Sequence, residues 1–303
     1  MGKYFGTDGF RGEANVNLTV DHAFEIGRFL GWYYGKDHKC KVVIGKDTRI
    51  SGDMLESALS AGLCSVGADV QLCGVVPTPA VAYLVKKYGA DAGIMISASH
   101  NPYEFNGIKI FSGDGYKLPD MIEEQIERIV LDEEGDVGTL PIAGAIGKIY
   151  VGYNPVKDYT DHVRTSVPNS LDGLKIAVDC ANGSASVTAE KLFTSLGAEC
   201  VFMHCSPDGE NINEKCGSTH MEELMDYVVR KNCDIGFAFD GDADRLLAVD
   251  ENGKQVDGDV IMAIVGNHMK SKGELKDNTI VATIMSNLGF FIMGKENGIN
   301  IEQ

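Results

Sequence analysis

The sequence predicts an α/β protein built from successive three-layer α/β domains, and three observations support this fold class. A unit made of a short apolar run, a glycine or serine turn, an amphipathic helix and a second apolar run occurs three times. The units recur at intervals far longer than the roughly 20 to 50 residues of a solenoid repeat, which indicates repeated domains. The length of 303 residues corresponds to two or three domains, at about 150 residues for a typical domain.

Each repeated unit has the pattern of a strand, a helix and a second strand. Such a unit pairs its two strands in parallel through a right-handed crossover. The expected strand, helix and strand are, in chain order, 42–44, 54–66 and 67–70; 174–178, 187–196 and 197–200; and 279–283, 288–296 and 298–301.

The units divide the chain into three expected domains. The first covers 1–150 and closes after a helix near 121–130 and a loop rich in glycine and acidic residues. The second covers 151–250, and a partial third covers 251–303. A lone strand–helix–strand unit is too small to bury its own core. We therefore expect either that the third domain is incomplete or that its last segment packs against the second domain.

Charge and composition exclude several classes of protein. The chain carries 44 acidic and 27 basic side chains, a net charge of -17, which repels phosphate backbones and anionic lipid. We therefore expect no nucleic-acid partner and no membrane partner. No apolar run approaches the roughly 18 residues that a membrane-spanning helix needs. The sequence predicts a cytoplasmic protein.

The eight cysteines show no Cys-x-x-Cys spacing, and several lie inside apolar runs. This pattern is typical of reduced core residues. His204 and Cys205, with Cys200 nearby, suggest a metal corner, but no fourth ligand stands at a useful spacing. We expect no zinc site from these residues.

Three polar loops, two of which contain glycine, could carry chemistry, and the first covers residues 5–12. It presents Arg11 among glycines that allow sharp turns. An arginine fork suits a phosphoryl group. The alternative is a plain turn with a solvent-facing arginine.

The second loop, residues 97–102, places Ser99 and His100 directly after an apolar run. Open α/β sheets bind ligands at the carboxyl ends of their strands, and an imidazole next to a hydroxyl can handle its proton. The alternative is a turn in which Ser99 only bonds backbone. Lys109 follows on a strand at 107–111, where an unpaired lysine is usually a solvated edge charge.

The third loop, residues 237–245, contains Asp240, Asp242 and Asp244 at alternate positions. Three such carboxylates repel one another unless a cation neutralises them, and oxygen ligands suit Mg²⁺. A solvated acidic loop is one alternative. An EF-hand is disfavoured because Arg245 stands where glycine is needed and residues 246–249 read as a strand.

A hydroxyl, a cradle for a divalent cation and two cationic side chains on loops after strands are the groups that phosphoryl transfer needs. The sequence contains no Walker A motif, so nucleotide use is not indicated.

Motifs in these loops resemble those of the α-D-phosphohexomutases and occur in the same order. They are Gly6-Thr7-Asp8-Gly9-Phe10-Arg11-Gly12, Ser97-Ala98-Ser99-His100-Asn101-Pro102, Asn106-Gly107-Ile108-Lys109 and Asp240-Gly241-Asp242-Ala243-Asp244-Arg245. The segments 114–118, 207–213 and 216–220 resemble the branch of this superfamily that acts on glucosamine phosphates.

The resemblance implies an enzyme, a Mg²⁺-dependent intramolecular phosphotransferase that interconverts glucosamine 6-phosphate and glucosamine 1-phosphate for cell-wall precursors. The reaction would pass through a phosphoserine enzyme and a 1,6-bisphosphate. Its partner would be a hexosamine phosphate, and a homodimer is compatible with the sequence.

The resemblance also implies a role for each site residue. The implied roles are Ser99 as the phosphorylated serine and a metal ligand, Asp240, Asp242 and Asp244 as the other metal ligands, Arg11, His100 and Lys109 as groups that steady the phosphoryl group and move the hydroxyl proton, and Arg245 as a neighbour of the metal. Lys109 can accept a proton only if its pKa is lowered.

The family's sugar-contacting loop and its fourth domain do not appear before Gln303. We therefore expect this polypeptide alone to bind hexose phosphate poorly and to have little or no mutase turnover. Three alternatives stay open: a phosphomannomutase or phosphoglucomutase of the same superfamily, an aspartyl-phosphate phosphatase with Asp240 as nucleophile and Asp242 as general acid, and a sugar-phosphate-binding module without catalysis.

Overall fold

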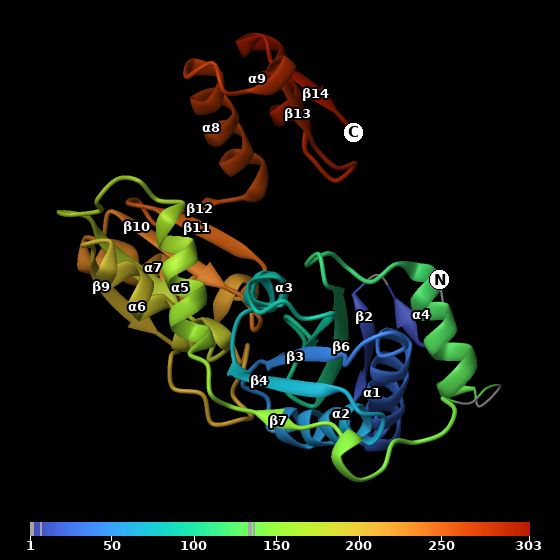
Figure 1. The fold of residues 1–303 in the computed structure, drawn as a ribbon. Coiled ribbons are helices and arrows are strands. Elements are labelled where there is room, and N and C mark those ends of the chain that lie inside the picture. Colours follow the sequence, from blue (N-terminus) through green and yellow to red (C-terminus); the bar gives the residue numbers. More distant parts are fainter. Residues whose placement is uncertain (1–2, 7, 133–134, 136) are drawn as a thin grey trace.

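The computed structural model describes residues 3–6, 8–132, 135 and 137–303 and divides them into three α/β units (Figure 1). Thr7 of the first glycine-bearing loop lies outside the described residues. Figure 1 shows the first two units side by side and the third set away from the first. In this described part of the chain, no helix is both long and apolar enough to cross a membrane.

The first unit is a seven-stranded mixed sheet with helices on both faces. Its strands are β1 (Phe5–Gly6), β2 (Gly9–Glu13), β3 (Lys41–Lys46), β4 (Asp69–Val75), β5 (Ala92–Ile96), β6 (Phe105–Ser112) and β7 (Ile149–Tyr150), in the order β1-β2-β6-β5-β3-β4-β7. Its helices are α1 (Val20–Tyr34), α2 (Gly52–Ser65), α3 (Thr78–Lys87) and α4 (Asp120–Ile126), which continues as a π-helical segment, Glu127–Leu131; a 3₁₀ turn, Ala143–Ala145, follows.

Alternation along β3 explains the three layers. Val42 and Ile44 pack in the core cluster that contains the buried faces of α1 and α2, whereas Val43 packs in the cluster under α3. All three side chains are fully buried. A strand buried on both faces has a continuous apolar run in its sequence. The run at 42–44 is the pattern that predicted this strand.

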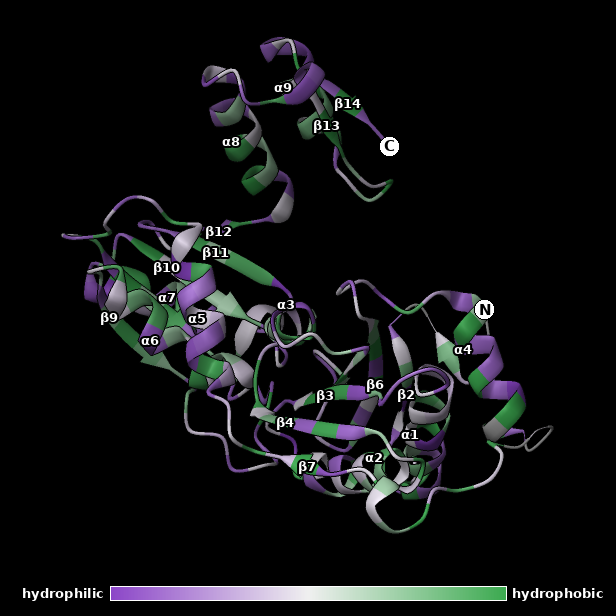
Figure 2. Ribbon diagram, in the orientation of Figure 1, coloured by the Kyte–Doolittle hydropathy of each residue, from purple (hydrophilic) through white to green (hydrophobic). Residues whose placement is uncertain are grey.

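The second unit is a five-stranded sheet. Its strands are β8 (Lys175–Asp179), β9 (Glu199–Met203), β10 (Ile235–Phe239), β11 (Leu246–Asp250) and β12 (Gln255–Val256), in the order β12-β11-β10-β8-β9. Its helices are α5 (Pro155–Thr165), α6 (Ala189–Ser195) and α7 (Glu222–Lys231), with 3₁₀ turns at Ser184–Val187 and Gly217–Thr219. Figure 2 shows a largely hydrophobic β11 and a largely hydrophilic α5.

The third unit contains two helices and two strands. They are α8 (Gly258–Ser271), β13 (Thr279–Val281), α9 (Leu288–Asn297) and β14 (Asn300–Glu302), with a 3₁₀ turn at Lys276–Asn278. In all three units the predicted strand–helix–strand pairing is confirmed, because β3 with β4, β8 with β9 and β13 with β14 are parallel.

The fold corrects two local expectations, for Lys109 and for the helix over 187–196, and confirms a third, the strand that argues against an EF-hand. The solvated-edge interpretation of Lys109 is wrong, because β6 lies between β2 and β5 inside the sheet. The helix expected over 187–196 begins instead as a 3₁₀ turn and becomes α-helical at Ala189. Residues 246–250 form β11, which confirms the argument against an EF-hand.

The first two units meet along two seams. At one, Tyr83 of α3 stacks on His162 of α5 with ring centroids 3.9 Å apart, and Tyr88 donates a 2.6 Å hydrogen bond to Asp158. At the other, loops at the carboxyl ends of β3, β4 and β5 contact loops that follow β8 and β10; for example, the Thr78 N–H donates to the Asp242 carbonyl at 2.9 Å. The second seam brings the predicted polar loops together.

Candidate active site

Ser99 lies in the loop after β5, and its hydroxyl faces the acidic loop of the second unit. The Oγ donates to Asp240 Oδ2 at 2.7 Å, and both residues are buried. Ser99 has φ +55°, a conformation that non-glycine residues rarely adopt. Its own N–H donates to Ser97 Oγ at 2.9 Å, which helps to hold this turn. The two loops that the sequence singled out therefore meet at these two side chains.

Two donors from opposite units hold the backbone of the serine loop. The carbonyl of Ser99 accepts hydrogen bonds from Arg49 Nη2 and Asn213 Nδ2, each at 2.9 Å. The same two groups also donate to the carbonyl of Asn101. Arg49 is fixed in turn by Asp47, whose Oδ2 accepts from Arg49 Nε at 2.9 Å and from Ser97 Oγ at 2.6 Å.

Asp242 has one occupied and one free oxygen. Its Oδ2 accepts from Thr78 Oγ1 at 2.5 Å and from Lys109 Nζ at 2.7 Å. Its Oδ1 is buried without a hydrogen-bond partner among the described residues. Burial favours the neutral acid, but Lys109 and Thr78 outweigh it and lower the pKa of Asp242. A buried carboxylate oxygen without a partner is costly unless a cation binds it.

The three aspartates fit a divalent cation. One carboxylate oxygen from each of Asp240, Asp242 and Asp244 lies within 4.8 Å of the others. Burial and the neighbouring Asp242 charge raise the pKa of Asp240, which is the repulsion that a bound cation relieves. Oxygen ligands and the free Asp242 Oδ1 together suit Mg²⁺.

Lys109 is a cation in this arrangement. It also approaches Asp244 Oδ2 at 3.3 Å. Burial favours the neutral amine, yet Asp242 and Asp244 raise the pKa of Lys109 above its usual value. The lowered pKa that a proton-accepting Lys109 needs is therefore not found in this arrangement.

Arg11 offers donors that are not used. It lies on β2 opposite Gly107 of β6. Its Nη2 is 3.3 Å from Asp8 Oδ2, an ion-pair distance without hydrogen-bond geometry, and both Nε and Nη2 are buried without a hydrogen-bond partner among the described residues. Two such guanidinium donors side by side match a phosphoryl group.

His100 and Arg245 form a pair next to the serine loop. The Arg245 Nη1 and His100 Nδ1 atoms are 3.0 Å apart. Because arginine can only donate, Nδ1 accepts and Nε2 carries the hydrogen of the neutral ring. Burial, then the charges of Arg245 and Arg11, lower the pKa of His100, which favours that neutral form.

Two hollows flank this cluster. One of about 610 Å³ opens beside His100, between the serine loop and the segment 210–220 of the second unit. A smaller one of about 190 Å³ lies beside Lys109 and Asp244. The cluster is therefore reached from two sides.

The structure thus brings the eight predicted site residues into one region, and it adds residues that sequence reasoning missed. Arg49, Thr78 and Asn213 contact the serine or the acidic loop directly. Arg49 and Thr78 follow buried strands, β3 and β4, so the rule applied to the other loops could have found them. Asn213 stands in a segment noted for its resemblance alone.

Comparison with known proteins defines the class. Three models of the phosphoglucomutase/phosphomannomutase family match the chain: α/β/α domain I over residues 2–136, domain II over 157–253 and domain III over 257–303. The chain belongs to this family of phosphosugar mutases, which are intramolecular phosphotransferases of the isomerase class.

More particular likeness comes from curated relatives. The chain is 53% identical over 303 residues to a phosphoglucosamine mutase of Acetivibrio thermocellus, covering 99% of the chain and 67% of that protein. It is 54% identical over 307 residues to a phosphoglucosamine mutase of Caldicellulosiruptor saccharolyticus, covering 100% and 68%. The chain thus spans about two thirds of the length of these relatives.

A solved structure supports the same assignment. A phosphoglucomutase/phosphomannomutase family protein from Burkholderia thailandensis matches with a TM-score of 0.81 and 26% sequence identity, covering 99% of this chain and 65% of that one. The domains in the chain therefore have the α/β/α architecture of phosphohexomutases.

Proposed function

We propose that the protein interconverts glucosamine 6-phosphate and glucosamine 1-phosphate through a phosphoserine at Ser99, with Mg²⁺ held by Asp240, Asp242 and Asp244. One observation supports this most: the Ser99 hydroxyl lies 2.7 Å from Asp240, beside an acidic triplet with a free buried oxygen. The glucosamine specificity rests on the names of the relatives, which are phosphoglucosamine mutases.

The proposed chemistry is two successive transfers. In the first, the bond between Ser99 Oγ and phosphorus breaks and phosphorus bonds to a substrate hydroxyl oxygen, giving a 1,6-bisphosphate. The hydroxyl proton ends on Ser99 Oγ, so no net proton is released. After the bisphosphate reorients, Ser99 Oγ bonds to its other phosphorus and the bond from that phosphorus to the sugar oxygen breaks. The serine proton ends on that sugar oxygen, and the sugar monophosphate leaves. In the structure Ser99 carries a free hydroxyl that donates to Asp240, so the structure corresponds to the unphosphorylated enzyme.

Charge neutralisation is the main contribution of the site in this proposal. Bound Mg²⁺ would offset the negative charge of the phosphoryl group. The free donors of Arg11 would bind phosphoryl oxygens, and Lys109 would act as a fixed positive charge. His100 would donate from Nε2 in its observed orientation. Asn213 and Arg49 would hold the serine loop so that Oγ stays in line with the incoming oxygen.

A half-reaction tests the proposal on this chain. The chain is first incubated with glucosamine 1,6-bisphosphate and Mg²⁺, desalted, and then mixed with glucosamine 6-phosphate, glucose 6-phosphate or mannose 6-phosphate. Intact mass should show one phosphoryl group gained in the first step. Glucosamine 6-phosphate should remove it slowly, because we expect this polypeptide alone to bind hexose phosphate poorly, and the rates with the other two sugars measure its selectivity.

Matched serine variants give the controls. Ser99→Ala should gain no phosphoryl group. Ser195→Ala should behave like the native chain, because among the described residues the exposed Ser195 hydroxyl bonds only the carbonyl of Leu192. Phosphorylation of the Ser99→Ala variant would contradict the proposal. Loss of phosphate to water at the same rate with and without sugar phosphate would also contradict it and would indicate a phosphatase.

A further inference from the structure

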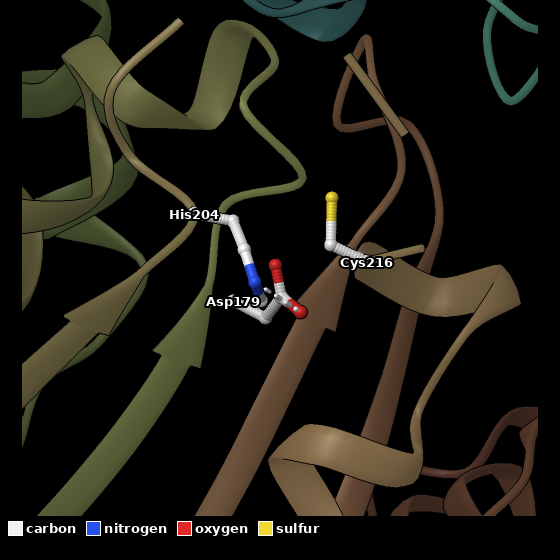
Figure 3. A group of neighbouring side chains, drawn as sticks. All are labelled: Asp179, His204 and Cys216. Carbon is white, nitrogen blue, oxygen red and sulfur yellow. Dashed lines mark ion pairs between the residues drawn. The ribbon is translucent and has the colours of Figure 1, made fainter. Parts of the chain in front are cut away.

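A second group of side chains that could hold a metal ion lies in the second unit. Asp179 ends β8, His204 follows β9 and Cys216 precedes the 3₁₀ turn Gly217–Thr219. Figure 3 shows the His204 ring next to the Asp179 carboxylate with Cys216 beside them, and the ligand atoms of the three residues all lie within 4.8 Å of one another. Asp179 and Cys216 are each 1% exposed.

We propose that Asp179, His204 and Cys216 bind Zn²⁺ at a site separate from the acidic triplet. The zinc corner rejected from the sequence combined His204 with Cys200 and Cys205. The fold instead places the exposed Cys205 apart from this group and brings Asp179 and Cys216 to the imidazole.

The imidazole supplies the most direct argument. His204 Nδ1 is 3.1 Å from Asp179 Oδ2 and buried, yet it makes no hydrogen bond with the described residues. The other ring nitrogen, Nε2, faces Glu223 Oε2 at 3.4 Å. Each ring nitrogen therefore faces a carboxylate, and a metal bound at Nδ1 would leave the ring proton on Nε2 beside Glu223, as in the carboxylate–histidine–zinc arrangements of metalloproteins. The Nδ1 lone pair then faces a carboxylate oxygen, an arrangement that a cation between them stabilises.

The carboxylate is already fixed in position. Asp179 Oδ1 accepts from the N–H of Ala181, and Oδ2 accepts from the N–H of Gly217, each at 2.9 Å. Each oxygen keeps a second lone pair for a metal. Little reorganisation is therefore needed on binding.

The thiol selects the metal. Nitrogen, oxygen and sulfur ligands together suit Zn²⁺, whereas Mg²⁺ prefers oxygen alone. Burial, then Asp179 and nearby glutamates, raise the pKa of the Cys216 thiol to about 12, so without a cation the group is neutral. Binding forms a sulfur–zinc bond and releases the thiol proton to solvent. Three protein ligands leave a fourth position for water.

Cobalt titration tests this site directly. The full chain, freed of metal by chelation, is titrated with Co²⁺ in the presence of a large excess of Mg²⁺, which keeps the acidic triplet filled. The site predicts a near-ultraviolet thiolate-to-cobalt band that saturates at one equivalent and is displaced by Zn²⁺. Absence of that band would overturn the proposal.

Variants separate this site from adventitious binding. Cys216→Ser and His204→Gly should lose the band, and glycine suits position 204 because its φ is +46°. Cys205→Ser should keep it, and a band lost in that variant but kept in Cys216→Ser would overturn the assignment.

Glu223→Gln changes an exposed side chain, so it should fold and should weaken Zn²⁺ binding about tenfold or more. Unchanged Zn²⁺ affinity in Glu223→Gln would argue against the arrangement even if Cys216→Ser failed to fold.

Discussion

Single residues set the position of the serine, and the strongest constraints come from side chains that carry no chemistry. Arg49 and Asn213 both donate to the carbonyl of Ser99. They come from different units, so the serine loop is held from both sides of the seam. The left-handed backbone at Ser99 persists because these donors fix it.

Removing one of these donors should slow phosphorylation of Ser99. Asn213→Ala removes the hydrogen bonds from Nδ2 to the carbonyls of Ser99 and Asn101. The bond to Ser99 alone is worth about 1 kcal/mol, which corresponds to a rate about fivefold lower if it holds the reactive geometry. The rate of phosphoryl gain from the bisphosphate, measured by intact mass, gives the comparison. Asn211→Ala, in the same loop but not bonded to Ser99, is the control; equal rates in the two variants would contradict the role assigned to Asn213.

The loss of folding stability at low pH should depend in part on Asp158. It accepts a hydrogen bond from Tyr88 and lies 2.9 Å from Lys87, and the hydrogen bond from Tyr88, then Lys87, holds the pKa of Asp158 below its usual value. A depressed pKa means that the folded state favours the charged form. The stabilisation is therefore present above pH 4 or so and is lost as the pH falls through the folded-state pKa.

Urea unfolding of the native chain and Asp158→Asn at two pH values measures this effect. At pH 7 the variant should be less stable by about 1 kcal/mol. The difference should shrink in the acid range. A difference that stayed constant or grew on acidification would show that Asp158 does not act through its charge.

At the scale of elements, the contact between α1 and α2 depends on glycine. A Cβ at Gly62 would lie 2.1 Å from the carbonyl oxygen of Phe24, and one at Gly27 would lie 2.4 Å from that of Leu59. The two helix backbones therefore touch directly. No side chain fits between them without moving a helix.

Gly62→Ala should consequently destabilise the protein. At an open helical site this change would raise the free energy of unfolding by about 1 kcal/mol. At a tightly packed site it should lower the free energy of unfolding by about 1 to 3 kcal/mol. The sign of the measured change therefore distinguishes a packed site from an open one. Thermal unfolding gives the measurement, with Ser57→Ala on the exposed face of α2 as the control. A raised Tm in Gly62→Ala would contradict the close approach.

Elements were more predictable than the contacts between them. The parallel strand pairs followed from apolar runs and turns, which are local signals. The position of Lys109 did not, because only the sheet order reveals that β6 is an interior strand. Ser99 and Asp240 could be singled out individually, but their 2.7 Å contact spans 141 positions and depends on how two units dock. Thr78 and Asn213 act through that docking, and Arg49 reaches Ser99 across 50 positions within the first unit, so no local pattern predicted their partners.

For the whole molecule, the acidic triplet joins the first unit to the second. Thr78 and Lys109 from the first unit both bond Asp242 of the second. A cation bound at the triplet should therefore stabilise both units together. Mg²⁺ at a large excess over its Kd should raise the Tm by several degrees.

Two variants test that linkage by calorimetry. Asp244→Asn should lose most of the Mg²⁺-dependent rise in Tm. Asp226→Asn should keep it, because exposed Asp226 pairs only with Arg230 in the described structure. An equal Mg²⁺ effect in Asp244→Asn and the native chain would place the cation elsewhere.

The central claim is that Ser99 and the acidic triplet form one site across two units. Phosphorus NMR of the chain phosphorylated on Ser99, with Mn²⁺ in place of Mg²⁺, tests it most directly. The account predicts that one equivalent of bound Mn²⁺ broadens the phosphoserine resonance severely and that Asp244→Asn reduces this broadening. A phosphoserine resonance that stayed sharp while Mn²⁺ was bound at the triplet would contradict it.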